Sequence, residues 1–261
     1  MDHQRDGLDV SIHQTLFATY DNPMIVVDSA DFDGTNDWMT RGAGLTGAAD
    51  SKKGIFSVWL RLDGGDGVGL YIAAMPSNKL IIRRGFATDT FVIVATNSAP
   101  NNILDMNTAG AYLAGATWLH LLASWDLATA GARHIYVNDV ADLSVNVFTD
   151  DTIDYTETDF FVGSSSAAGA NLFNGCIAEL YFAPGQYLDF SIVSNRRKFI
   201  SASGKPVYLG TTGAVPTGTA PLVYQHLDDA EAVADFATNR GTGGDFTITG
   251  TLVTGSDSPS G

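Results

Sequence analysis

The stretch that decides the fold is TWLHLLASWDLATAGARHIYVND, which runs from Thr117 to Asp139. Its first half places apolar residues at every second position, which is the period of a β-strand: Leu119, Leu121, Ala123 and Trp125. The small-residue segment DLATAGAR supplies a turn, HIYVN alternates again, and Asn-Asp offers a second tight turn. The stretch therefore predicts antiparallel strands with one buried face.

The same period recurs on both sides of this hairpin. It is clearest in FSVWLRL (56–62). GLYIAAM and KLIIRRG (69–85) follow, separated by PSN, a turn signal that suggests a hairpin. TFVIVATN (90–97) is a nearly continuous apolar run, which is typical of a strand covered on both faces. The segment 101–116 shows no clear period and is predicted to be a long loop. We therefore predict an all-β fold in which two antiparallel sheets pack as a sandwich, with one domain spanning residues 28–254.

One segment has a helical pattern, DFSIVSNRRKFISASGKP (189–206), and it predicts a single short helix near 190–201. Asp189 or Ser191 is the expected N-cap. The basic run RRK (196–198) suits the negative end of the helix dipole. Gly204 and Pro206 end the pattern.

Composition excludes several classes of function. The chain has 29 acidic and 14 basic residues, a net charge of -15, and would repel a phosphate backbone, so we expect no nucleic-acid partner. No apolar stretch reaches the length of a membrane helix, and MDHQRDGLDVSIHQ (1–14) lacks the apolar region of a secretory signal. We therefore expect that the protein is synthesised in the cytoplasm and that it does not insert into a membrane. The single cysteine, Cys176, lies in an apolar run and is interpreted as a small buried residue.

Four stretches, in this order, resemble the laminin-G-like branch of the concanavalin A-like jelly rolls. They are FDGTNDWM (32–39), FSVWLRL (56–62), the opening hairpin, and FVGSSSAAGANLFNGCIAELYFAPG (161–185). This resemblance implies a two-sheet jelly roll. The chain departs from the family at Asp139, where the family has glycine, and at Ala178, where it has an acid. NRGTGGDFTITGTL (239–252) resembles a string that many members carry at the N-terminus, so we predict that this end supplies that strand.

The resemblance also bears on where the protein works. NRRKFISASGKPVYLG (195–210) and PTGTAPLVY (216–224) are similar to C-terminal regions of tailed-bacteriophage proteins, in which laminin-G-like folds occur on virions. This implies a virion location and other virion proteins as partners, and a homo-oligomer is plausible. Residues 1–27 are the expected docking arm, in which MIVVDS (24–29) would add to a neighbour's sheet or else pack on its own domain. Residues 255–261 are expected to form a flexible tail.

The family has an enzymatic branch, the glucanases, whose signature is E-x-D-x-x-E on one strand. Glu157 and Asp159 fit its first two positions, but Val162 stands where the second glutamate is needed. We therefore expect no catalytic residues and no enzymatic activity.

Calcium is the usual ion of this family, and no other cofactor is expected. The candidate loop is DGTND, with Asp33, Asn36 and Asp37 as ligands, although an ordinary solvated turn explains it equally well.

A sugar needs an exposed aromatic surface with hydrogen-bonding neighbours. Trp38 and Tyr112 are the candidates because both lie near predicted loops. His120 and His134 are expected to oppose each other on the outward face of the hairpin, as ligand contacts or as half-exposed histidines. Our leading hypothesis is a non-enzymatic virion protein (head decoration, spike or tail fibre) that contacts host surface glycan. The alternative is a carbohydrate-binding module of a bacterial surface or secreted protein.

Overall fold

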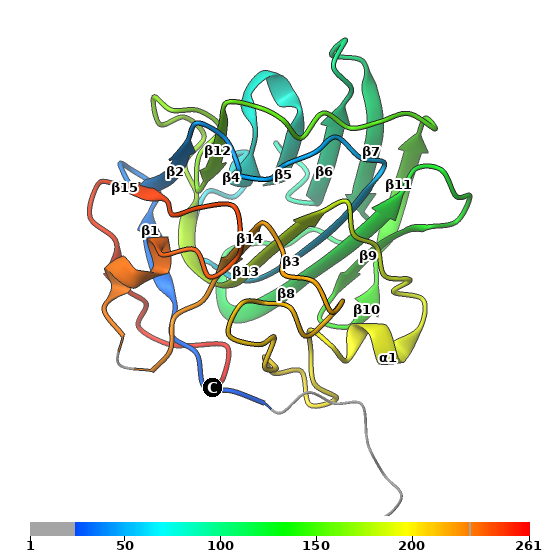
Figure 1. The fold of residues 1–261 in the computed structure, drawn as a ribbon. Coiled ribbons are helices and arrows are strands. Elements are labelled where there is room, and N and C mark those ends of the chain that lie inside the picture. The colour runs from blue at the N-terminus through cyan, green and yellow to red at the C-terminus, as the bar shows by residue number, and fades with distance from the viewer. Residues whose placement is uncertain (1–23, 230) are drawn as a thin grey trace, which may run out of the picture.

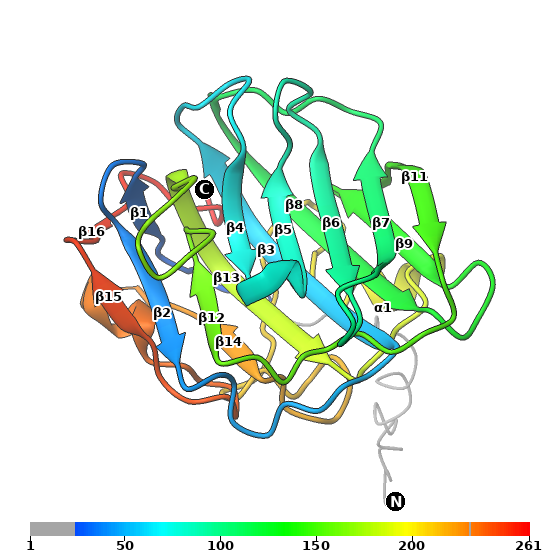
Figure 2. The ribbon, with the colours of Figure 1, turned by 90° about the horizontal axis from the view of Figure 1, so that it is seen from above.

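The computed structural model describes residues 24–229 and 231–261. The chain forms two antiparallel sheets of eight strands each, packed as a sandwich (Figures 1 and 2). The predicted all-β sandwich is thus confirmed.

We call the two layers the back sheet and the front sheet. The back sheet has the spatial order β10 (Val140–Ala141), β9 (Arg133–Val137), β8 (Gly115–Asp126), β3 (Lys53–Leu62), β13 (Asn174–Pro184), β1 (Ala30–Asp33) and β16 (Val253–Thr254), and β14 (Val223–Gln225) also pairs with β13. The front sheet has the order β11 (Leu143–Phe148), β7 (Asn102–Thr108), β6 (Phe91–Thr96), β5 (Leu80–Arg84), β4 (Leu70–Ala74), β12 (Asp159–Val162), β2 (Trp38–Gly42) and β15 (Thr247–Thr249). Two 3₁₀ turns, η1 (Pro76–Asn78) and η2 (Val233–Ala237), and one helix, α1 (Val193–Arg196), complete the described elements.

The hydrophobic core lies between the two sheets. The inward residues of β3 and β8 are those predicted from the alternation, among them Phe56, Val58, Leu121 and Trp125, and all four are buried. The indole of Trp125 donates a hydrogen bond to the Tyr155 hydroxyl at 2.9 Å, so its polar atom is satisfied inside the core.

The outer side of the back sheet is covered as well. Phe190, Phe199 and Leu209 pack on outward residues of β3, β8 and β13, and Figure 1 shows this yellow-to-orange part of the chain on the side away from the front sheet. The polar residues Ser57 and His120, which face this side, are therefore buried. Among the described residues, the apolar clusters outside the core all involve the back sheet, so the outer face of the front sheet is the one without a covering layer.

Two sequence predictions need correction. The segment 101–116, predicted to be a loop, contains β7, in which Leu104 and Met106 point into the core while Asp105 and Asn107 face outward. The predicted helix is only four residues long and begins after Ile192, which makes no side-chain cap hydrogen bond. Asp189 does not cap α1, because its carboxylate binds the backbone N–H and hydroxyl of Ser191.

The basic residues at the end of α1 bind a carboxylate. Arg196 Nε lies 2.5 Å and Arg197 Nη2 2.7 Å from the carboxylate oxygens of Asp139. Asp139 lies in the tight turn between β9 and β10 with a φ of 65°, as its turn-forming character predicted. These contacts tie the covering segment to the back sheet.

Both ends of the described chain pack on the sandwich. β15, which lies in the late glycine string, pairs with β2, and β16, which follows the string, pairs with β1. Met24 and Val27 form bridges with Val207 and Asp228 of their own domain. Residues 1–23 of the predicted docking arm lie outside the described residues. The predicted flexible tail makes specific contacts, including a hydrogen bond from the Gly255 N–H to the Ser29 carbonyl.

None of the helices in the described part has the length and apolar character of a membrane-spanning helix.

Candidate functional site

A groove of about 460 Å³ crosses strands β5, β6, β7 and β11 on the outer face of the front sheet. Strand register brings Arg83, Val92, Asn107 and Val145 into one row across four strands. Asp105 lies two residues from Asn107 on the same strand and therefore on the same face. We call this feature the front groove.

Four polar side-chain atoms of the front groove have no partners. Arg83 Nε and Nη1, Asp105 Oδ1 and Asn107 Oδ1 are buried and make no hydrogen bond with a described residue. Leaving a buried polar atom unpaired costs about 1–3 kcal/mol, so such a group calls for an explanation. Here donors and acceptors that could bind a ligand gather in one depression.

Apolar and aromatic groups complete the lining of the front groove. The Arg83 guanidinium lies 4.7 Å from the ring centre of Phe86 and 5.8 Å from that of Tyr71. Phe86 is 48% exposed, and Val92 and Val94 lie between the polar groups. The groove thus combines apolar surface with a cation, a carboxylate and an amide.

A second cavity, of about 720 Å³, lies at the outer side of the back sheet. Trp59, Trp118 and Ile200 supply its apolar lining, and Lys205 and Asp257 are among its polar groups. His120 stacks on Trp59 at 4.7 Å between ring centres, and its Nε2 lies 2.8 Å from the Ser57 hydroxyl. We call this cavity the tryptophan pocket.

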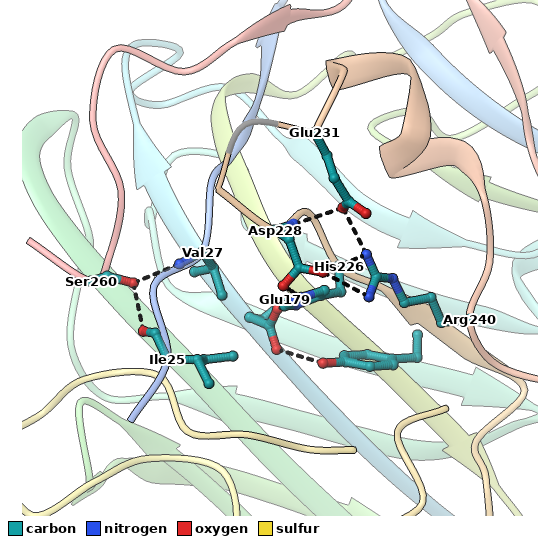
Figure 3. Close-up of polar contacts among 9 residues, drawn as sticks. Ile25, Val27, Glu179, His226, Asp228, Glu231, Arg240 and Ser260 are labelled. Carbon is teal, nitrogen blue, oxygen red and sulfur yellow. Dashed lines mark hydrogen bonds and ion pairs between the residues drawn. The ribbon is translucent and has the colours of Figure 1, made fainter. Parts of the chain in front are cut away.

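A third feature is a buried polar network on strands β13 and β14 (Figure 3). Glu179, with a φ of 51°, interrupts the register of β13 and accepts a hydrogen bond from the Tyr224 hydroxyl at 3.0 Å. It also contacts His226 Nδ1, and His226 Nε2 lies 2.8 Å from Asp228, which pairs with Arg240. The network lies apart from the linings of the front groove and the tryptophan pocket. It therefore serves to join β14 to β13.

Histidine titration in this fold predicts a stability maximum near pH 6.5. Burial alone would lower the pKa of His226, but hydrogen bonds and charge from Glu179 and Asp228 outweigh it and raise the pKa. This stabilisation is complete below about pH 6.5, the unfolded value, and is lost as pH rises through the folded pKa. Burial lowers the pKa of His120 to about 3 and also lowers that of His134, so their contribution weakens as pH falls below about 6.5. The free energy of unfolding, measured with urea from pH 5 to 9, should fall on both sides of this maximum. His226→Gln should remove the decrease on the alkaline side.

The predicted sugar-stacking residues are not free aromatic surfaces. Trp38 is half-buried on β2, where a Cβ at Gly169 would lie 2.6 Å from its ring. Tyr112 stacks on Phe91 at 4.7 Å between ring centres, and its hydroxyl donates to Asp142. Both rings lie outside the linings of the two cavities.

The two histidines do not oppose each other, which corrects the prediction. His134 pairs with Ser124 in the strand register and lies 3.1 Å from the Tyr187 hydroxyl. His120 is fully buried, and Asn138 is hydrogen-bonded to its backbone. The covering segment, which the local pattern could not reveal, buries the face on which His120 lies.

The candidate calcium loop is held by hydrogen bonds to its own carboxylates. Asp33 Oδ1 accepts the backbone N–H groups of Thr35 and Asn36 at 2.7 and 3.0 Å, and Asp37 Oδ1 accepts that of Thr251 at 2.7 Å. These contacts agree with an ordinary turn, which was the alternative to calcium. Calcium binding by this loop stays a prediction.

One further group has metal-ligand atoms close together, namely Asp31, Asp63 and Cys176, within 4.8 Å of one another. Burial and the neighbouring Asp31 raise the pKa of the Cys176 thiol to about 12. Arg61 already pairs with Asp63 at 2.7 Å. The group is better explained as an ion pair beside a buried thiol.

Comparison with known proteins places the fold. No protein-family model and no curated protein sequence matches the chain. It is similar in structure to a protein of Bacteroides ovatus described as a candidate carbohydrate-binding protein, with a TM-score of 0.60 and 13% identity, over 89% of this chain and 60% of that one. It is also similar to a SAP-like pentraxin of Limulus polyphemus, with a TM-score of 0.53 and 12% identity, over 88% of this chain and 94% of that one. These two structures share the two-sheet antiparallel sandwich of this chain. The chain spans 60% of the length of the Bacteroides protein.

Sequence reasoning missed both cavities. Asp105 and Asn107 fell in the segment predicted to be a loop, although their alternation with Leu104 and Met106 was a usable strand signal. Trp59 and Trp118 lie inside strands, where a tryptophan is usually a packing residue. Trp59 is 3% exposed, yet it belongs to the lining of the tryptophan pocket.

Proposed function

We propose that the protein is a non-enzymatic glycan-binding protein that holds a neutral carbohydrate in the front groove. The observation that carries this proposal is the set of unpaired polar side chains, Arg83, Asp105 and Asn107, in a groove that also presents apolar surface.

The chemistry of the lining suits a sugar. A sugar hydroxyl both donates and accepts hydrogen bonds, so one ring can accept from Arg83 while donating to Asp105 and to the Asn107 amide oxygen. Its C–H face can pack on the apolar groups between them, since ligand sites are mainly apolar with a few well-placed polar groups. Asp105 disfavours an anionic ligand here, which is why we specify a neutral carbohydrate.

The fold comparison also supports this proposal. The Bacteroides ovatus protein, whose description names carbohydrate binding as its candidate role, has the same fold over most of this chain. At 13% identity the similarity concerns the fold, so the argument for this chain rests on the residues of the front groove.

A glycan array followed by calorimetric titration of the best neutral oligosaccharide tests the proposal. Asp105→Asn and Asn107→Ala should each weaken binding about tenfold, because each removes a hydrogen bond in a partly buried site. Asp159→Asn is the matched control, since Asp159 lies on the same sheet but outside the groove, and its affinity should equal that of the unmodified protein. Equal affinities for all three variants would refute the front groove as the binding site.

The virion role predicted from the sequence stays a prediction. It rests on sequence resemblance alone, whereas glycan binding also has the lining of the front groove in its favour. Particles that lack the protein would recapture it at fixed sites if it were a virion component. If the protein binds glycan but does not associate with particles, the carbohydrate-binding module is the correct hypothesis and the virion role is wrong.

A further inference from the structure

Two basic side chains of the described residues, those of Arg83 and Lys205, make no hydrogen bond or ion pair. Every other described lysine and arginine makes at least one. Arg83 lines the front groove, and Lys205 lines the tryptophan pocket. The front groove also holds the unpaired carboxylate oxygen of Asp105, which disfavours an anion there. In a chain with a net charge of -15, Lys205 is therefore the cation that would accept an anionic group.

The carboxylate in the tryptophan pocket does not neutralise Lys205. Asp257 is bound by Arg61, whose guanidinium also pairs with Asp63. The positive charge that remains available to a ligand is therefore that of Lys205.

The wall of the tryptophan pocket is held in place by hydrogen bonds. Ser260 Oγ accepts from the Val27 N–H and donates to the Ile25 carbonyl, both at 3.0 Å (Figure 3). Ser29 Oγ donates to the Asp257 carbonyl at 2.9 Å. The segment 257–261 is thus fixed against the sandwich, which makes this a formed pocket rather than a gap beside a loose tail.

Part of the lining of the tryptophan pocket is aromatic. Trp59 and Trp118 lie beside Ile200, and the Trp118 indole N–H is buried without a partner. A volume of about 720 Å³ is within the usual range for small-molecule sites. A sugar ring with an apolar C–H face and a carboxylate substituent matches these features.

We infer that the tryptophan pocket is a second ligand site, which takes a carboxylate-bearing sugar such as a uronic acid. The ring packs on Trp118 and the carboxylate pairs with Lys205. This inference rests on the proposed function only in that the ligand is a sugar, because the pocket shares no residue with the front groove.

Methyl glucuronide and methyl glucoside are the matched probes, since the first carries a carboxylate where the second carries a hydroxymethyl group. Each probe is titrated into the full chain while the NMR signals of the indole N–H groups of its four tryptophans are recorded. The signals of Trp118 and Trp59 should shift with the glucuronide and not with the glucoside. Lys205→Met should weaken glucuronide binding at least tenfold, because a charge-assisted contact is lost, and Lys205→Arg should restore most of it. Lys52→Met is the control, since Lys52 pairs with Asp150 and lines neither cavity, and it should leave glucuronide binding unchanged.

Three results would overturn the inference: unmoved Trp118 and Trp59 signals, equal responses to the two probes, or unchanged affinity in Lys205→Met. Because Asp105→Asn acts on the front groove alone, failure of the tryptophan pocket and failure of the proposed function give different patterns. Normal glucuronide binding in Asp105→Asn together with lost neutral-glycan binding would support two separate sites.

Discussion

Replacing Glu179 by alanine is expected to lower the free energy of unfolding by about 3–5 kcal/mol, the cost of removing one partner of a buried ion pair. The Glu179 side chain is 3% exposed and binds both the Tyr224 hydroxyl and His226. Its loss leaves a protonated His226 and a buried hydroxyl without their acceptor. Urea unfolding at pH 6, followed by tryptophan fluorescence, measures the change.

Two further variants show whether burial is the cause. Glu179→Gln keeps the volume and one acceptor, so it should lose clearly less stability than the alanine variant. Glu231→Gln removes a partner of Arg240 at the more exposed end of the same network, where such pairs contribute about 0–1 kcal/mol. A loss in Glu231→Gln as large as that in Glu179→Ala would contradict the assignment of Glu179 as the buried anchor.

The strands that could be predicted are those whose pattern is complete within a few residues. Phe56, Val58, Leu121 and Trp125 alternate with other side chains, and this period alone indicates which side faces the core. The turn at Asn138 and Asp139 was equally local, because both residues tolerate the positive φ that they adopt.

The covering layer and the two cavities depend on contacts between distant segments. Ser57 and His120 look like solvent-facing residues in the sequence, yet the segment after β13 buries both. The front groove needs Arg83, Asp105 and Asn107 to meet across three strands, and their register is set by pairing that no single stretch encodes. Local patterns therefore predicted the sandwich but not its sites.

Replacing Asp139 by glycine is expected to destabilise the protein by about 2 kcal/mol at pH 7, even though glycine suits a φ of 65° better than aspartate does. Glycine relieves backbone strain at this φ, but the free energy gained in this way is smaller than the free energy lost with the contacts to Arg196 and Arg197. The side chains of these two arginines are 10% and 17% exposed. Because these contacts are only partly buried, the expected loss is below that of Glu179→Ala. Chemical unfolding of the two proteins at pH 7 gives the difference.

The pH dependence of this difference separates charge from backbone shape. Burial raises the pKa of Asp139, but the hydrogen bonds and charges of Arg196 and Arg197 outweigh it and lower the pKa overall. The stabilisation is therefore present above the unfolded pKa of about 3.9 and is lost as pH falls through the folded value. The difference in unfolding free energy between the unmodified protein and Asp139→Gly should therefore become smaller in acid. Asp139→Asn tolerates the turn but carries no charge, so its difference from the unmodified protein should also become smaller in acid. A gap that stays constant with pH would mean that the turn, and not the link to the covering segment, is what Asp139 stabilises.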